Sequence, residues 1–466
     1  MKSKIALLLG VALMITGCGG AADAGAEISP KEEIVSGTES GGTAGGNDAD
    51  TPGNSGSEGE SQDTSSEADG EEGAYTAGGN AQDISFNIDR ADLKGGYERA
   101  TFFADEIYKT NGENTIVSPL SLEMALGLAA EGASGHTADE LYAYLGNKDY
   151  SRWARDYMKY ASSLKSERDP NADEFEFSYD FCYELADSIW IRRDYELQTD
   201  YKKAAEKYFS AEAENVDFVK DADRTAERIN SWCNDKTHGM IPEVVNTDMF
   251  SEGLSAILMN TVYFESPWRE KWGTVQHGFT NLDGKYTTQE MLSDTLDVYY
   301  ENEYATGFSK SYLNGFTFVG ILPKEEGEFN LSDLDIEGLM DSASYDYDVK
   351  AIMPKLDFET TTACGNIIAI LEAEGVNRAF DKRMAEFDGI VEGHDLYIDE
   401  IMQKCKIELD EEGTRAAAVT AMMMLNATAV FEPTPVKEVY LDRPFAFMIY
   451  DSVNDQIVFI GKVTGI

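Results

Sequence analysis

The sequence lacks the short motifs that mark most enzymes. It has only four histidines and five cysteines in 466 residues. The histidines show no HExxH or other metal-binding spacing, and the cysteines form no CxxC pair. There is also no GxSxG elbow, P-loop or dinucleotide-binding fingerprint. These absences make the hypothesis of an enzyme weak.

Basic residues are scarce as well. The chain has 38 lysines and arginines against 86 acidic residues, which gives a formal net charge of −48. A surface this negative repels phosphates, so nucleic acid and anionic lipid are not expected as partners of the folded part. The acidity itself is explained most simply as a solubilising surface.

The amino terminus has the features of an export signal. Lys2 and Lys4 precede an apolar run, residues 5–15, which is too short to span a bilayer. The following "ITGC" resembles the lipobox of bacterial lipoproteins, which implies cleavage before Cys18 and attachment of lipid to it. The alternative is an ordinary signal peptide with a chance cysteine. We expect a lipid-anchored protein of the cell envelope, with its domain facing the extracellular side.

Residues 19–85 have the composition of a linker. They are rich in Gly, Ser, Ala, Thr, Asp and Glu, and Lys31 is their only basic residue. Such a segment has too few apolar residues to form a core, so we expect a disordered stalk between the signal peptide, residues 1–18, and a domain over 86–466. The cysteines of that domain are isolated, as small core residues usually are, although a disulfide in an exported protein stays open. They are Cys182, Cys233, Cys364 and Cys405.

The domain changes from helical to strand-rich patterns along its length. Helices are predicted around Phe103 and Ile107, after Ser118 and Pro119, in "QTDYKKAAEKYF", and in "ADRTAERINSWCNDK", which a glycine stops. Strands are predicted in "ADSIWIRR", "AILMNTVYFESPW", "FTFVGILPKE", "KAIMPKLDFET" and "EVYLDRPFAFMIYD". This order indicates an α+β domain built around large sheets.

One stretch fits neither a helix nor a surface strand. "DEEGTRAAAVTAMMMLNATAVF", residues 410–431, begins as a charged turn and continues with small and apolar residues. It has no stripe at helical spacing, and an exposed strand of this length would invite aggregation.

Several motifs in order resemble the serpin family over residues 86–466. They are "NTIVSPLSLEMALGLAAEGASGHTADEL", "INSWCNDKTHGMI", "LMNTVYFESPW", "DEEGTRAAAVTA" and "LDRPFAFMIYD". The resemblance implies a large central β-sheet with additional sheets, about eight to nine helices and an exposed reactive-centre loop. It implies a monomeric serine protease inhibitor that acts as a suicide substrate, with loop 411–433 cleaved and then inserted into the central sheet. Such an inhibitor is not an enzyme and needs no catalytic residues, no metal and no cofactor of its own.

The resemblance also assigns a hinge to the start of this loop. Its residues are Glu411, Glu412, Gly413, Thr414, Ala416, Ala417, Ala418 and Thr420. Side chains of a strand alternate between its two faces, so the family register turns Thr414, Ala416, Ala418 and Thr420 inward and Arg415 outward. Counting sixteen residues from Glu411 places the reactive bond at Ala427–Thr428, with Met424 or Leu425 as alternatives.

Five further residues match family positions that control opening of the sheet. They are Ser118, Ser121, Asn260, Gln403 and Trp268. For Ser118 and Ser121, capping of a helix is an equally good interpretation, and one residue could do both. Gln403 stands where many serpins have histidine, so imidazole-based pH sensitivity should be absent.

A small residue at the cut favours an elastase-like or subtilisin-like extracellular serine protease, which would form a covalent acyl-enzyme complex. Two other hypotheses are weighed against this one. The first is a non-inhibitory serpin that serves as a surface binding protein or carrier. It would need a hinge spoiled by proline, bulk or inward charge, which is absent. The second is an adhesin or solute-binding lipoprotein, which only the signal and stalk support.

Overall fold

The computed structural model describes residues 96–166, 180–362, 366–393, 396–414 and 434–466. The chain divides into two units, Met1–Gly79 and Asn80–Ile466, and every described residue belongs to the second. The predicted signal peptide, Cys18 and the stalk lie outside the described residues. No helix in the described ranges is long and apolar enough to cross a membrane.

Eight α-helices occur in the described part of the chain, within the number that the sequence predicts. They are α1 (Gly96–Asn111), α2 (Pro119–Glu131), α3 (Gly135–Leu145), α4 (Tyr150–Ser163), α5 (Thr199–Phe209), α6 (Ala222–Lys236), α7 (Ile336–Asp341) and α8 (Asn366–Ala373).

Three sheets accompany these helices. A six-stranded sheet has the order β1 (Thr115–Val117), β17 (Gln456–Val463), β16 (Phe445–Asp451), β10 (Phe316–Pro323), β9 (Ala305–Ser311) and β8 (Tyr299–Glu301). A four-stranded sheet has the order β15 (Val436–Tyr440), β11 (Asp348–Pro354), β7 (Tyr286–Leu296) and β6 (Gly273–Thr280). A seven-stranded sheet has the order β12 (Leu356–Thr361), β13 (Glu400–Leu409), β14 (Gly413–Thr414), β5 (Ala256–Pro267), β3 (Phe181–Arg192) and β2 (Lys165–Ser166), with β4 (Glu212–Val216) paired to β3.

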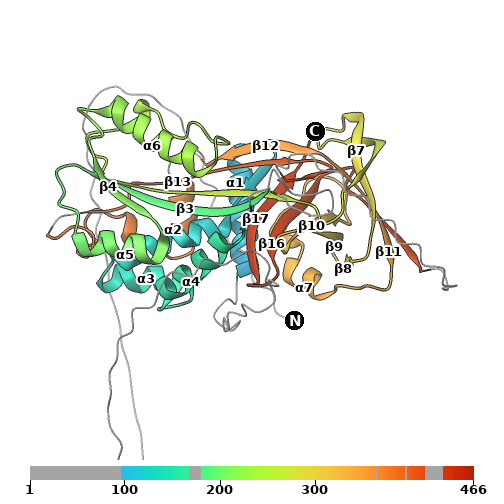
Figure 1. The fold of residues 1–466 in the computed structure, drawn as a ribbon, viewed down its shortest axis with the longest axis horizontal. Coiled ribbons are helices and arrows are strands. Elements are labelled where there is room, and N and C mark those ends of the chain that lie inside the picture. The colour runs from blue at the N-terminus through green and yellow to red at the C-terminus, as the bar shows by residue number, and fades with distance from the viewer. Residues whose placement is uncertain (1–95, 167–179, 363–365, 394–395, 415–433) are drawn as a thin grey trace, which may run out of the picture. The chain divides into compact units, whose positions relative to one another are not determined.

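The seven-stranded sheet is covered on both faces. Figure 1 shows α6 on one side of it and α2 to α5 on the other. Residues of β3 alternate accordingly: Tyr183 and Leu185 belong to the large core, whereas Cys182 and Ala186 belong to a smaller core beneath α6. Because both faces of the sheet are covered, the residues of β3 are almost continuously buried.

The α+β class is confirmed, and three predicted elements need correction. The helix predicted after Ser118 is two helices, because the chain leaves helical geometry at Gly132 and resumes at Gly135. "KAIMPKLDFET" contributes β11 and β12 to two different sheets, since Pro354 ends β11 and cannot donate a ladder hydrogen bond beyond it. "EVYLDRPFAFMIYD" is likewise divided into β15 and β16.

The pairing of β13 with β5 positions the candidate site. These strands run parallel and pair directly from Glu400↔Ile257 to Gln403↔Asn260. Farther along, β14 lies between them, through Leu409↔Thr414 on one side and Thr414↔Ser266 on the other. Between these two points, the described residues show no pairing of β13 with β5. The sheet therefore has an opening that β14 enters at one end.

Candidate functional site

A buried polar cluster lies at the closed end of the opening. The Gln403 side chain accepts a hydrogen bond from the Ser118 backbone N–H at 3.0 Å. Its Nε2 donates to the Ser118 carbonyl at 2.9 Å and to Asn260 Oδ1 at 3.1 Å. Ser121 Oγ also donates to Asn260 Oδ1, at 2.9 Å. The structure thus brings together four of the five residues that the sequence assigned to opening of the sheet, and the fifth, Trp268, lies at the other end of β5.

Ser118 and Ser121 differ in which of the two predicted roles, helix capping or bonding within the cluster, their side chains have. Ser118 Oγ accepts the Ser121 N–H at 3.3 Å and so caps α2, while the Ser118 backbone binds Gln403. Only the hydroxyl of Ser121 reaches across to β5. Thr362, which the sequence did not single out, bonds both the N–H and the carbonyl of Gln403 through its hydroxyl. Nothing in the local sequence distinguishes this threonine from its neighbours.

Asp187 lies directly opposite Asn260 on the neighbouring strand β3. It is 2% exposed, and its carboxyl oxygens, like the Asn260 side-chain nitrogen, have no hydrogen-bond partner among the described residues. Burial raises the pKa of this carboxyl well above its usual range. The pKa of Asp187 is therefore higher in the folded than in the unfolded protein. Because of this difference, the free energy of unfolding falls as pH rises from the unfolded-state pKa to the folded-state pKa.

We expect Asp187→Asn to stabilise the protein at neutral pH. The amide cannot ionise, so folding no longer has to bury a carboxyl group that is charged in the unfolded chain, which is worth at least about 2 kcal/mol. The gain should shrink as pH falls towards the unfolded pKa of aspartate, because Asp187 of the unfolded wild-type chain then also becomes neutral. Melting temperatures of both proteins at pH 8 and pH 5 test this. Asp200→Asn, at an exposed position of α5, is the control and should change little. An equal gain at both pH values would contradict the charge argument.

The hinge begins as a tight turn before β14. Asp410 Oδ1 accepts the backbone N–H of Glu412 at 2.8 Å and of Gly413 at 3.3 Å. The Asp410 N–H donates to the Gly413 carbonyl at 2.9 Å. Two ion pairs hold the glutamates: Lys355 lies 2.7 Å from Glu411, and Lys271 contacts Glu412. The hydrogen bond from Lys355 is the main cause of a lowered Glu411 pKa.

Trp268 fastens this turn to the end of β5. Its indole N–H donates to the Asp410 carbonyl at 2.9 Å, and its backbone N–H donates to the Glu412 carbonyl at 3.0 Å. The indole ring stacks on Tyr312, with centroids 4.1 Å apart. Trp268, which the sequence assigned to opening of the sheet, thus packs on Tyr312 and also makes two hydrogen bonds to the turn.

Thr414 points into the core, as the predicted register requires. It is 3% exposed, and its hydroxyl lies 2.7 Å from the Tyr312 hydroxyl. Tyr312 is itself buried, and burial raises its pKa. The remaining hinge residues Ala416, Ala417, Ala418 and Thr420, and the predicted bond Ala427–Thr428, lie outside the described residues.

Comparisons with known proteins agree with this geometry. The family model "Serpin (serine protease inhibitor)" matches residues 99–466. An uncharacterized serpin-like protein of Thermococcus kodakarensis is 29% identical over 378 residues, covering 78% of this chain and 83% of its own. Iripin-8 of Ixodes ricinus is 28% identical over 366 residues, covering 76% and 88%.

The same fold occurs in a solved structure. The crystal structure of the thermophilic serpin Tengpin in its native state matches with a TM-score of 0.66 and 29% identity, covering 82% of this chain and 96% of that one. The family model spans nearly all of the described residues, from α1 to the last strand. This chain belongs to the serpin family.

Proposed function

We propose that this protein inhibits serine proteases as a suicide substrate. The observation that carries the proposal is the opening in the seven-stranded sheet, which β14 enters between β13 and β5 while the two strands pair directly only at the other end. The segment that follows β14 is the predicted reactive loop. It can therefore continue as an antiparallel central strand without changing the order of the sheet.

Continuing the register of β14 gives each hinge residue a neighbour in the inserted form. Ala416 would lie between Ile407 and Phe264, which belong to the large core. Arg415 would lie on the opposite face, next to Glu408 and Glu265 of the flanking strands. The small side chain of Ala416 would therefore face the core, and the positive charge of Arg415 would lie beside two carboxylates.

The same register places Thr420 level with the polar cluster. Thr420 would arrive between Gln403 and Asn260, whose side chains are joined by a 3.1 Å hydrogen bond. Insertion beyond this point requires that bond to break and β13 to separate from β5. The hydrogen bonds of the polar cluster therefore keep β13 and β5 paired until the loop is cleaved.

The chemistry is that of the target protease. Its serine attacks the Ala427 carbonyl, the Ala427–Thr428 amide breaks, and an ester to Ala427 forms while Thr428 becomes a new amino terminus. Insertion then drags the protease along and distorts its oxyanion hole, so water cannot complete hydrolysis. The small Ala427 fits an elastase-like or subtilisin-like pocket, and a cut at Met424 or Leu425 would favour chymotrypsin-like or subtilisin-like enzymes.

Incubation with elastase-like, trypsin-like and subtilisin-like proteases tests this function. We expect a covalent complex that survives a denaturing gel, together with a released carboxyl-terminal fragment that begins at Thr428. A protease with its active-site serine blocked is the control and should give neither product. Clean cleavage without complex would contradict inhibition, and a fragment that begins at Leu425 or Asn426 would move the reactive bond.

The proposal includes a location and an assembly state. Lipid on Cys18 and the stalk over 19–85 would hold a monomeric inhibitor on the outside of the cell envelope. This placement rests on the sequence "ITGC" and the composition of the linker. It would allow the reactive loop to meet extracellular proteases.

A further inference from the structure

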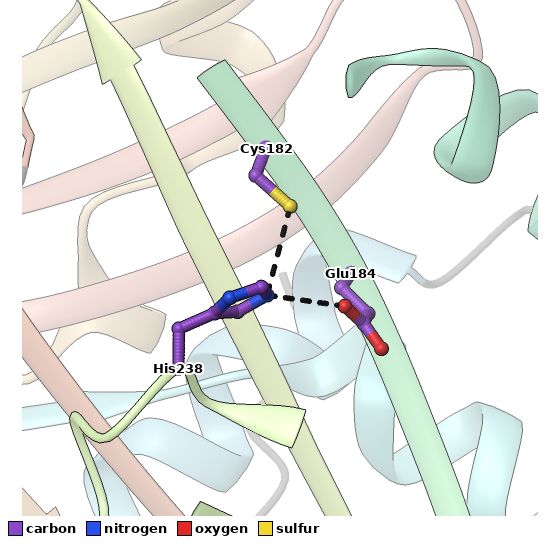
Figure 2. A group of neighbouring side chains, drawn as sticks. All are labelled: Cys182, Glu184 and His238. Carbon is purple, nitrogen blue, oxygen red and sulfur yellow. Dashed lines mark hydrogen bonds and ion pairs between the residues drawn. The ribbon is translucent and has the colours of Figure 1, made fainter. Parts of the chain in front are cut away.

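Three side chains with metal-binding chemistry meet on the face of the seven-stranded sheet that α6 covers. Figure 2 shows Cys182 and Glu184 on β3, with His238 facing both from the turn after α6. His238 Nε2 lies 4.0 Å from Cys182 Sγ and 3.3 Å from Glu184 Oε2. The three ligand atoms all lie within 4.8 Å of one another.

Local backbone geometry brings the trio together. Cys182 and Glu184 are two positions apart on one strand, so their side chains share a face. His238 adopts a left-handed conformation, with φ 49°, directly after the end of α6. A non-glycine residue there costs about 1 kcal/mol or more. The Tyr263 ring packs against the imidazole, with centroids 4.4 Å apart, and orients it towards β3.

The arrangement differs from that of a cysteine nucleophile with its base. In a catalytic relay, the thiol and the carboxylate bind opposite nitrogens of the imidazole. Here both neighbours approach the same nitrogen, Nε2. Three donor atoms of these kinds grouped within 4.8 Å of one another are the pattern of ligands around an ion.

We propose that Cys182, Glu184 and His238 form a site for Zn²⁺ or a similar borderline-soft divalent ion. Thiolate, imidazole and carboxylate are the donors that such ions prefer. Tetrahedral zinc separates a sulfur from a nitrogen ligand by about 3.5 Å and an oxygen from a nitrogen by about 3.3 Å. The observed 3.3 Å already fits, and the thiol would move closer to both other atoms on binding, since it lies 4.0 Å from Nε2 and within 4.8 Å of the carboxylate oxygen.

The surroundings suit an accessible three-ligand site. Cys182 is buried and His238 is exposed, so an ion can reach the trio from solvent on the His238 side and keep water as its fourth ligand. Lys236 Nζ lies 3.4 Å from Glu184 Oε1, which leaves Oε2 for the metal. Such an outer partner orients the carboxylate. A bound ion would tie the end of α6 to β3.

Titration of the full chain with Co²⁺, followed by Zn²⁺, tests the site. We expect a thiolate-to-cobalt absorption band that Zn²⁺ abolishes. At zinc concentrations about one hundredfold above the dissociation constant, the melting temperature should rise by about 3 to 5 °C. Cys182→Ser, Glu184→Gln and His238→Asn should each weaken binding at least about tenfold, and Cys182→Ser should abolish the band. Asparagine at 238 tolerates the left-handed backbone.

Cys364→Ser and His277→Asn are the matched controls. His277 lies on β6, 3.2 Å from Asp442, and neither control should change the titration. Melting temperatures measured without metal show which variants fold. One folded variant is enough to test whether the substituted side chain binds the ion. Binding that survives loss of Cys182 or His238, or that disappears in a control variant, would overturn the proposal, as would a wild-type chain without the cobalt band.

Discussion

Thr414→Arg is expected to turn this protein from an inhibitor of its target protease into a substrate. The moles of inhibitor consumed per mole of protease inactivated should rise at least tenfold, which corresponds to about 1.4 kcal/mol on the barrier to insertion. Most of the cleaved variant would be released without a covalent complex. The effect is large because insertion competes directly with hydrolysis of the acyl-enzyme.

The physical reason is the position of Thr414 in the described sheet. Its side chain is 3% exposed and bonded to the buried Tyr312 hydroxyl. An arginine there would have to bury a guanidinium against Tyr312 and the stacked Trp268, two neutral side chains that supply no opposite charge. An unpaired buried charge costs several kcal/mol, so the variant should leave the hinge outside the sheet.

Two controls separate this effect from a general disturbance of the loop. Thr414→Ser keeps the hydroxyl that reaches Tyr312 and should still inhibit. Arg415→Ala changes the charge at the next position, on the outward face, and should change the stoichiometry less than twofold. Gel densitometry and mass spectrometry follow complex and cleaved product. Full complex yield from Thr414→Arg would mean that the predicted register is wrong.

Sequence reasoning predicted the elements of this fold better than their partners. The start of α2 at Ser118 and Pro119 could be found because a capping side chain and proline are local signals. The buried face of α6, with Ile229 and Trp232, follows from helical spacing. The resemblance to serpins supplied the residues of the polar cluster, and the structure supplied their hydrogen bonds.

Contacts between distant segments had no local signal. Tyr312 and Thr414 are 102 positions apart, and no periodicity connects them. Cys182 and His238 are 56 positions apart, so a search for short metal motifs could not find their approach. Asp187 occupies a strand that the sequence predicted, yet only the packing shows that its carboxylate has no partner among the described residues. Such positions depend on the topology of the sheet rather than on neighbouring residues.

Cleavage inside the reactive loop is expected to raise the melting temperature of the domain by at least about 10 °C. In the uncut chain, the described sheet leaves β13 unpaired with β5 between Gln403 and Leu409. An inserted strand would pair on both sides, and each cross-strand pair contributes about 0.2 to 1 kcal/mol. A dozen inserted residues therefore add on the order of 10 kcal/mol, and each kcal/mol raises the melting temperature by about 1 to 2 °C in a domain of this size.

The uncut protein is then kinetically trapped. The form with the loop inserted has the lower free energy, and it can be reached only after the loop is cut. Brief treatment with a metalloprotease, which forms no acyl-enzyme, would cut the loop without trapping the protease, and calorimetry would compare cut and uncut chains. Cut Thr414→Arg provides the internal control, because its hinge should resist insertion and its melting temperature should rise much less. If the cut wild-type chain melts at the same temperature as the uncut chain, its loop stays outside the sheet. Inhibition by insertion would then be excluded, since the same new strand must both stabilise the cut form and move the protease.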